Sequence, residues 1–374
     1  MKLNKTMGRV ATTLVATAML ASVAVVPAFA TDYTAVSGGT TTFDKYLVMD
    51  EDANVPTADF TFAIGAGTDV AATDSTPAVK GASAEQAALV TVSKDGFVPS
   101  ETTYDSVQNG DTLTLGADEK YAVDVVTVDF SKVSFSTPGI YRFSVTESGT
   151  VNGVTNDTTS TRYIDVYVVD NNGALSVSNY ILHDGTAAVP GDGKYTDKAT
   201  GFTNTYATQN VTLTKQVEGN MGDKSKDFTF TITITSADGA KSYDITGADI
   251  KTITTAKPEG TAAYTGSATV ELCDDETVTI KGLSAGDTYT ITETSVDGYE
   301  TKIATGSTTS SEDATIVSNA FANKTIADAT AVTFYNISEA STPTGIVMDI
   351  APYALLVVVA AAGCFVFMRK RRED

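Results

Sequence analysis

The chain has 374 residues and a formal net charge of −21 at pH 7, with 46 acidic against 25 basic side chains. This acidity argues against nucleic-acid binding, because phosphate backbones are bound by clustered Lys and Arg. His183 is the only histidine, which excludes a His-based catalytic triad and a metal site built from several histidines. The acidic stretch 50–52 lacks the spaced oxygen ligands of a calcium-binding loop, so we expect it to form a solvated turn. We therefore expect no cofactor.

The start of the chain has the pattern of a secretory signal peptide. A basic beginning is followed by an apolar run over 10–26 and by Ala28-Phe29-Ala30, the small-x-small pattern that a signal peptidase recognises. The basic residues are Lys2, Lys5 and Arg9. A membrane anchor is the alternative, and Pro27 before the cleavage pattern makes it the weaker one. We therefore expect residues 1–30 to be removed and the mature, exported chain to begin at Thr31.

The exported part consists of short alternating segments that predict β-strands. β-Branched and aromatic residues suit a half-buried pleated surface. The clearest such segments are 163–169, 228–234 and 289–294. Clusters of Gly, Asn and Asp at 151–157 and 170–173 mark turns, and the best helix signal is the short stretch 82–89. The pattern predicts an all-β fold.

The exported part is long enough for two domains, and an internal repeat divides it. The sequence Asp-Phe-Thr-Phe occurs at 59–62 and again at 227–230. In both places a lysine opens a strand, a short polar loop follows, and the Asp-Phe-Thr-Phe segment comes after this loop. We therefore expect one β-domain over 31–207 and a second over 208–340.

Three residue types recur in the same order in both halves. An alternating strand ends on Thr-Glu in each half, and an asparagine follows one strand step past an aromatic residue. The two sets are Lys45, Glu147, Asn204 and Lys215, Glu293, Asn336. Taken singly, a strand Lys or Glu is usually solvated and an Asn near a turn usually caps it. The ordered recurrence within matching frames favours a common chemical role.

These residue types can form an amide cross-link between the first and last strands of each domain. A lysine amine attacks the asparagine carboxamide carbon and expels ammonia. Burial lowers the pKa of a lysine and supplies the free amine, and burial raises the pKa of the glutamate, so that it can be protonated, bind the amide oxygen and carry a proton to the leaving ammonia. Such a cross-link suits an exported chain whose cysteines, Cys273 and Cys364, offer no disulfide in the exported part.

The C-terminal segment 341–374 combines three features. Ser341-Thr342-Pro343-Thr344-Gly345 precedes an apolar stretch from Ala351 to Met368, near the length of a membrane-spanning helix, and a basic tail over 369–372 follows. A plain single-pass anchor explains the helix and the tail but leaves the Pro-Thr-Gly element unexplained.

This segment resembles the sorting signal of Gram-positive surface proteins that a sortase reads. The resemblance implies cleavage between Thr344 and Gly345, with the Thr344 carbonyl passed to an amine and the membrane helix serving as a temporary stop. The common signal is Leu-Pro-any-Thr-Gly, and the Ser-Thr at 341–342 departs from it, which leaves the sortase class open.

Together these features resemble the isopeptide-forming backbone pilins of Gram-positive bacteria, in particular the two-domain streptococcal type. The resemblance implies two tandem immunoglobulin-like β-sandwiches with Lys45–Asn204 and Lys215–Asn336 bonds and with Glu147 and Glu293 as catalytic acids. The first domain is longer than the second, and we expect its extra length to form loops between residues 63 and 138. The chain would then be no turnover enzyme but a structural subunit of a surface pilus.

Polymerisation of such pilins uses a lysine near the end of the first domain as the acceptor amine. Lys198 and Lys194 both lie in a Gly-, Asp- and Thr-rich segment that predicts an exposed loop, and Lys198 is favoured while Lys194 competes. The implied partners are a sortase, further copies of the chain, a tip pilin and peptidoglycan. The alternative is a wall-anchored adhesin that binds a host ligand and does not polymerise.

Overall fold

The computed structural model describes residues 33–185, 189, 195–236, 238–307, 310–340, 357 and 360. The expected signal peptide, the Thr344–Gly345 cleavage site and Lys194 lie outside these residues. Within the described part of the chain, no helix combines the length and the apolar character that crossing a membrane requires.

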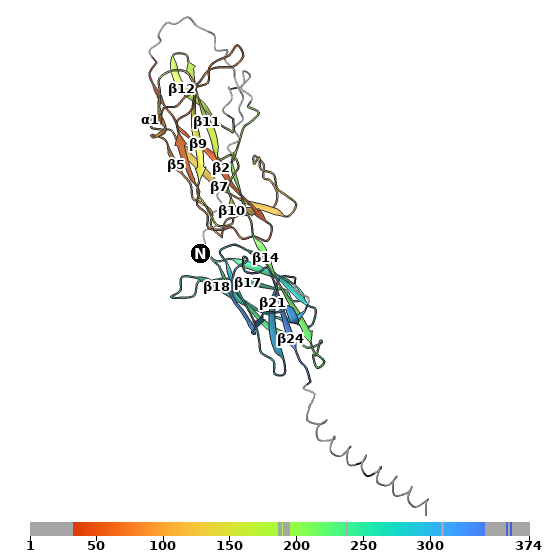
Figure 1. Ribbon diagram of the computed structural model, residues 1–374. Coiled ribbons are helices and arrows are strands. Elements are labelled where there is room, and N and C mark those ends of the chain that lie inside the picture. The colour runs from red at the N-terminus through yellow and green to blue at the C-terminus, as the bar shows by residue number, and fades with distance from the viewer. Residues whose placement is uncertain are drawn as a thin grey trace, which may run out of the picture.

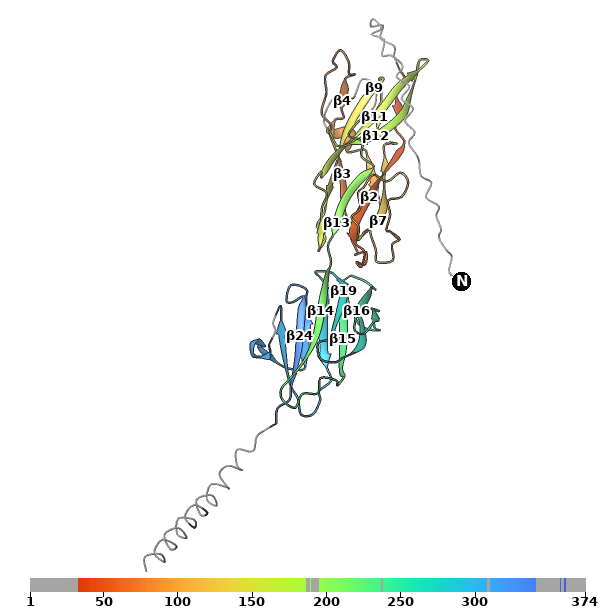
Figure 2. The same cartoon turned by 90° about the vertical axis from the view of Figure 1, so that its right-hand side faces the viewer.

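The described chain forms two elongated β-lobes joined end to end (Figures 1 and 2). Strands β1 to β13 build the first lobe and strands β14 to β24 the second, and each lobe has its own large apolar core. Within the two lobes, described helix is limited to α1 (Ala84–Ala87), within the expected helical stretch and capped by Ser83, and to the 3₁₀ turn η1 (Ser311–Asp313). The expected all-β fold is confirmed.

In the first lobe, two large sheets pack face to face. One contains β10 (Val154–Thr155), β13 (Gly201–Tyr206), β2 (Thr40–Asp50), β7 (Glu119–Asp129) and β5 (Thr91–Ser93) in this order, with β6 (Thr103–Tyr104) also paired to β7. The facing sheet contains β12 (Ala174–His183), β11 (Thr161–Asn171), β9 (Gly139–Ser148) and β3 (Thr61–Gly65), with β4 (Val79–Gly81) also paired to β9. A small ribbon pairs β1 (Val36–Ser37) with β8 (Ser134–Phe135).

The second lobe repeats this two-sheet plan. Its larger sheet contains β17 (Lys251–Thr254), β16 (Ser242–Gly247), β19 (Thr277–Leu283), β14 (Gln209–Glu218), β24 (Ala331–Ile337), β21 (Glu300–Thr305) and β22 (Ile316–Val317). The facing sheet contains β18 (Tyr264–Leu272), β15 (Phe228–Ser236), β20 (Thr288–Glu293) and β23 (Ala320–Lys324).

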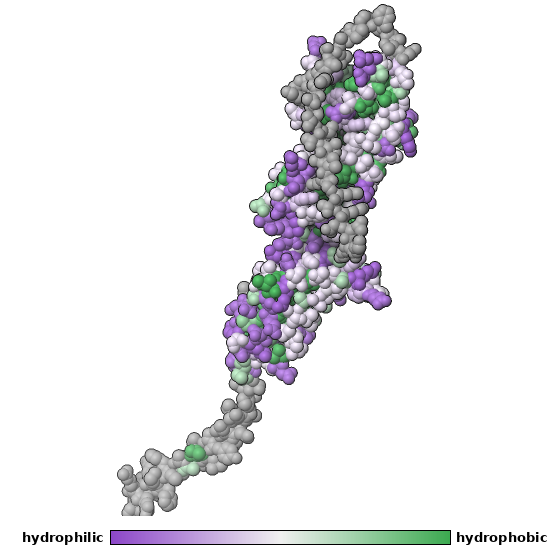
Figure 3. Space-filling view, turned by 180° about the vertical axis from the view of Figure 1, so that it is seen from behind, coloured by the Kyte–Doolittle hydropathy of each residue, from purple (hydrophilic) through white to green (hydrophobic). Residues whose placement is uncertain are grey.

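Alternation of apolar and polar residues explains why these strands form. In β15, Phe228, Phe230, Ile232 and Ile234 are fully buried, and the threonines between them face the other side of the sheet. The turn between β11 and β12 contains Asn172 and Gly173 with φ of 55° and 92°, the left-handed conformations that a tight hairpin requires. On the described surface shown in Figure 3, hydrophobic residues form small patches among hydrophilic ones, as expected when most apolar side chains lie in the two cores.

The segment between residues 63 and 138, where we expected the extra length of the first lobe to form loops, is not loop throughout. The segment between residues 63 and 138 contains β7, which pairs with β2 over the whole of both strands, from Thr40–Asp129 to Asp50–Glu119. The alternation in β7 places Tyr121, Ala122, Val126 and Val128 in apolar clusters, so this segment is part of the sheet. β7 lies next to β2 in the first lobe, as β19 lies next to β14 in the second lobe.

Polar contacts join the two lobes. Asn54 Nδ2 donates to the Ser242 carbonyl at 2.8 Å, the Thr57 N–H donates to Asp238 Oδ2 at 2.7 Å, and Lys281 Nζ lies 2.9 Å from Asp52 Oδ2. The acidic stretch 50–52 is an exposed turn, as expected, and it lies at this joint.

Candidate functional site

In each lobe the first long strand and the last strand are parallel neighbours in the larger sheet. In the first lobe Lys45 on β2 pairs with Phe202 on β13, and Asn204 follows two residues later. Side chains two residues apart on a strand share one face of the sheet. Lys45 and Asn204 therefore project from adjacent strands to the same side.

The second lobe has the same register. Lys215 on β14 pairs with Phe334 on β24, and Asn336 follows two residues later. The two lobes thus place lysine and asparagine in the same relative positions, although these residues are far apart in the sequence.

The glutamates come from the facing sheets. Glu147 on β9 pairs with Phe62 on β3, and Glu293 on β20 pairs with Phe230 on β15. Both phenylalanines are the last residue of an Asp-Phe-Thr-Phe segment. The repeated motif therefore aligns each glutamate so that it reaches across the core toward the lysine and the asparagine.

In the first lobe the three side chains are in contact. Lys45 Nζ lies 2.8 Å from Glu147 Oε1, and both side chains are 1% exposed. Asn204 Nδ2 donates a hydrogen bond to the same oxygen at 3.0 Å. A single glutamate oxygen thus touches both the amine and the amide nitrogen.

In the second lobe the side chains are equally buried but the contacts are looser. Lys215 Nζ lies 3.8 Å from Glu293 Oε1 and donates to the carbonyls of Gln216 at 2.8 Å and Phe334 at 3.3 Å. Asn336 is fully buried, and neither of its amide atoms has a hydrogen-bond partner among the described residues. Thr301 Oγ1 donates to the other oxygen of Glu293 at 3.2 Å.

An aromatic ring lies beside each amine. Lys45 Nζ lies 4.8 Å from the centre of the Phe60 ring, and Lys215 Nζ lies 4.3 Å from that of Phe228. These phenylalanines are the first aromatic residues of the two Asp-Phe-Thr-Phe segments. The sequence revealed the repeated motif, but its role as a wall of the site becomes visible only in the folded chain.

The electrostatics of the site favour a reactive amine. Burial lowers the pKa of Lys45 to about 8 and that of Lys215 to about 8, although the adjacent glutamates oppose this shift. Burial raises the pKa of Glu293, while Lys215, Thr301 and Asn336 act against this shift. A lysine with such a pKa has a substantial free-amine fraction near neutral pH.

A third buried lysine provides a contrast. Lys241 Nζ lies 2.5 Å from Asp238 Oδ1 and 3.6 Å from Asp287 Oδ1. Burial would lower its pKa, but Asp287, Tyr206 and Asp238 outweigh this effect and leave the pKa above its ordinary value. Lys241 therefore remains a charged ammonium, so burial alone does not make a lysine nucleophilic.

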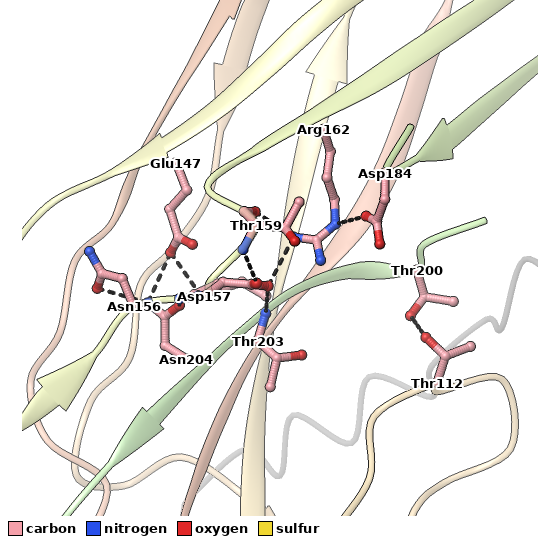
Figure 4. Close-up of polar contacts among 11 residues, drawn as sticks. Thr112, Glu147, Asn156, Asp157, Thr159, Arg162, Asp184, Thr200, Thr203 and Asn204 are labelled. Atoms are coloured by element: carbon pink, nitrogen blue, oxygen red, sulfur yellow. Dashed lines mark hydrogen bonds and ion pairs between the residues drawn. The ribbon is translucent and has the colours of Figure 1, made fainter. Parts of the chain in front are cut away.

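The expected bond between the glutamate and the amide oxygen does not occur in the first lobe. The backbone N–H of Asp157 donates to Asn204 Oδ1 at 2.7 Å, and a backbone N–H can only donate, so this contact fixes which end of the amide is oxygen. Glu147 therefore faces the amide nitrogen instead. Figure 4 shows Glu147, Asn156 and Asp157 gathered around Asn204.

The sequence reasoning missed Asp157 and its partner Arg162. Arg162 Nη1 donates to Asp157 Oδ2 at 2.9 Å, and the guanidinium lies over the Phe202 ring at 4.4 Å. The only sequence signal was the turn composition at 151–157, which indicates a loop but not its position beside Asn204.

Lys198 is exposed at the end of the facing sheet. Its backbone forms an isolated β-bridge with His183, and the next residue, Ala199, donates its N–H to the Leu182 carbonyl. The nearby Tyr195 hydroxyl donates to the buried Asp165 at 2.8 Å. Among the described residues there is no cluster of His, Cys, Asp and Glu suited to a metal ion.

Two family models match the chain. The Spy0128-like isopeptide containing domain matches residues 42–207, and a domain of unknown function, DUF7601, matches residues 209–338. The pilin of Streptococcus pyogenes serotype M1 is 29% identical over 354 residues, which cover 90% of this chain and 92% of that pilin. The pilus tip adhesin Cpa of Streptococcus pyogenes is 33% identical over 99 residues, 26% of this chain and 13% of the adhesin.

Solved structures share the fold. The crystal structure of the major pilin from Streptococcus pyogenes covers 82% of this chain and 100% of its own, with a TM-score of 0.51 and 20% identity. The major pilin T3.2 from Streptococcus pyogenes serotype GAS13637 covers 81% of this chain and 99% of its own, with a TM-score of 0.52 and 21% identity.

Proposed function

We propose that the chain is the structural subunit of a sortase-assembled pilus on a Gram-positive cell surface, because its residues 42–207 match the model of the Spy0128-like isopeptide containing domain. Each lobe acts as an immunoglobulin-like sandwich held by one self-formed Lys–Asn amide bond. The observation that carries this proposal is the duplicated placement of lysine, glutamate and asparagine in two buried cores.

The geometry supports a single-turnover reaction within each lobe. The free amine of Lys45 attacks the carboxamide carbon of Asn204, and Glu147 Oε1 accepts a proton from the amine and returns one to the departing nitrogen. The contacts of 2.8 Å and 3.0 Å put this oxygen next to both groups. Lys215, Glu293 and Asn336 perform the same reaction in the second lobe.

The position of these bonds suits a fibre under tension. β2 is the first long strand of the first lobe and β13 is its last strand, and the Lys45–Asn204 bond would join these two strands directly. Tension applied at the two ends of the lobe then passes through a covalent bond instead of the hydrogen bonds of the sheet. The Lys215–Asn336 bond between β14 and β24 does the same in the second lobe.

Subunits join through the C-terminal signal. A sortase cleaves between Thr344 and Gly345 and transfers the Thr344 acyl group to a lysine of the next subunit, and the last subunit is passed to peptidoglycan. Lys198 is the favoured acceptor because it is exposed, and Lys194 is its competitor. Before sorting, the membrane helix holds the exported precursor at the cell surface, and a tip pilin completes the fibre.

A non-polymerising adhesin anchored to the cell wall is the second candidate, and the partial match to a pilus tip adhesin favours it. Cell-wall extracts separate the two functions. A ladder of covalent oligomers is expected for the pilus subunit, and one anchored species would indicate the adhesin.

The intact mass of the mature chain, residues 31–344, tests the cross-links. We expect a mass lower than the sequence mass by two ammonia molecules, with one ammonia restored by Glu147→Ala and one by Glu293→Ala. An unmodified mass for the wild-type chain would refute both bonds.

A further inference from the structure

The amide oxygen of Asn204 has a dedicated hydrogen-bond donor in the folded lobe. The Asp157 N–H donates to Oδ1 at 2.7 Å, while Nδ2 donates to Glu147 Oε1 at 3.0 Å and to Asn156 Oδ1 at 3.3 Å. The leaving nitrogen and the carbonyl oxygen of the amide are therefore served by different groups. The glutamate contacts the nitrogen, and the backbone polarises the carbonyl.

The loop that presents this N–H is held by the side chain of Asp157 (Figure 4). Asp157 Oδ1 accepts from the Thr159 N–H at 2.8 Å, and Oδ2 accepts from the Thr203 N–H at 2.8 Å and from Arg162 Nη1 at 2.9 Å. Thr203 directly precedes Asn204 on β13, so one carboxylate ties the loop to the strand that carries the reacting amide. The donor is thus in place before the reaction begins, which is the property that makes oxyanion donors effective.

We propose that the backbone N–H of Asp157 stabilises the negative charge that develops on Asn204 Oδ1 while the Lys45–Asn204 bond forms. This proposal rests on the proposed function and adds a catalytic group to it. The Lys45 lone pair forms the new bond to Asn204 Cγ, and the carbonyl electron pair moves to Oδ1, where the N–H donates to it.

The remaining steps conserve all atoms. A proton from the attacking nitrogen passes through Glu147 Oε1 to Nδ2, the Cγ–Nδ2 bond breaks, the carbonyl reforms and ammonia leaves. One amine and one carboxamide give one secondary amide and one ammonia, and no other reactant is needed. The Asp157 N–H gains no proton and loses none.

The second lobe lacks this arrangement among the described residues. Asn336 Oδ1 has no hydrogen-bond partner there, and the distance between lysine and glutamate is 3.8 Å instead of the 2.8 Å in the first lobe. We therefore expect the Lys45–Asn204 bond to form faster than the Lys215–Asn336 bond within the same molecule.

The experiment follows both bonds in one chain. The mature chain is prepared unfolded from inclusion bodies, folded at about pH 5 to keep the lysines protonated, and shifted to about pH 8. Samples are quenched over time, digested, and the two cross-linked peptides are quantified by mass spectrometry. The wild-type chain is compared with the same chain carrying L-malate at position 157, the α-hydroxy analogue of aspartate, which keeps the carboxylate and replaces only the backbone N–H by an ester oxygen.

Loss of the N–H is expected to slow formation of the Lys45–Asn204 bond by about 10²- to 10³-fold relative to the wild-type chain. The Lys215–Asn336 bond in the same molecules should keep its rate, which controls for folding of the chain and for conditions. Equal Lys45–Asn204 rates in the wild-type chain and the malate chain would overturn the proposal.

Two further measurements keep the test decisive. Asp157→Ala removes the carboxylate alone and Asp157→Pro removes the carboxylate and the N–H, so the Lys45–Asn204 bond should form more slowly in Asp157→Pro than in Asp157→Ala even if the ester disturbs folding. In the wild-type chain, slower formation of Lys45–Asn204 than of Lys215–Asn336 would contradict the inference without any variant. Absence of both bonds from the wild-type chain would instead contradict the proposed function.

Discussion

Lys45 Nζ and Glu147 Oε1 lie 2.8 Å apart in the core of the first lobe, although the two residues belong to opposite sheets. Removing two charges from water costs several kcal/mol per ion, and the attraction between them repays this only in part. Conversion of the ammonium into an amide with loss of ammonia would leave the extra proton on Glu147, so that neither charge would remain buried. The same contact that is costly in the unlinked chain therefore prepares the reaction that relieves the cost.

The Lys45–Asn204 bond should stabilise the first lobe alone. Asn204→Ala removes the carboxamide and is expected to lower the free energy of unfolding of this lobe by about 4 to 5 kcal/mol, by analogy with a disulfide that closes a loop of over 100 residues. Differential scanning calorimetry should show the first-lobe transition at a lower temperature. Asn336→Ala is the matched control and should lower the second-lobe transition instead. If either variant shifted both transitions, the two Lys–Asn bonds would not stabilise their lobes independently.

Bond formation should depend on pH through the lysine amines. Because burial lowers the pKa of both Lys45 and Lys215 to about 8, the rate should rise as pH increases toward 8 and then level off. At two pH units below the pKa, only about one amine in a hundred is free. The rate is read from ammonia release after the pH jump. Continued tenfold increases per pH unit up to about 10 would mean an ordinary, solvated lysine.

Lys241 should matter for stability but not for cross-linking. Lys241→Met leaves the fully buried Asp287 without its ammonium partner, which is expected to lower the free energy of unfolding by about 3 to 5 kcal/mol. Chemical denaturation measures the loss, and the intact mass should still lack two ammonia molecules. Lys281→Met removes a half-exposed ion pair with Asp52 and should cost only about 0 to 1 kcal/mol. If the Lys241→Met chain lacked fewer than two ammonia molecules relative to its own sequence mass, Lys241 would be shown to react.

Gly201 allows the first and last strands of the first lobe to approach. A Cβ at this position would collide with the backbone carbonyl of Asp44 on β2. Gly201→Ala should therefore push β13 away from β2, cost about 1 to 3 kcal/mol and slow the Lys45–Asn204 bond. Gly39→Ala is the control, because its Cβ would meet only the Tyr180 hydroxyl at 3.6 Å. Normal cross-linking in Gly201→Ala would show that this close approach is dispensable.

The acceptor amine can be identified by conservative substitution. Lys198→Arg keeps an exposed positive charge but removes the nucleophilic amine, since a guanidinium stays protonated. We expect loss of the covalent ladder in cell-wall extracts, with the subunit itself still anchored. Lys257→Arg changes another exposed lysine and should leave the ladder intact. An unchanged ladder in Lys198→Arg together with its loss in Lys194→Arg would move the acceptor to Lys194.

Much of the fold could be predicted because it is encoded locally. The alternation of apolar and β-branched residues at 163–169, 228–234 and 289–294 predicted strands, and β11, β15 and β20 contain almost all of these residues. β7 was missed as a strand because its segment lies among short strands and turns, and its role depends on pairing with the distant β2. Pairing between remote segments has no local signature.

The sequence by itself determined the candidate residues, because the order Lys, Glu, Asn and the Asp-Phe-Thr-Phe frame are both repeated and can be compared without coordinates. Only the tertiary structure decided how these residues meet. Sheet register places Lys45 and Asn204 on one face, and the packing of the second sheet brings Glu147 to them. The loop that contains Asp157 supplies its backbone N–H to Asn204. Distances of a few ångströms between residues dozens of positions apart arise from packing, and no spacing along the chain encodes them.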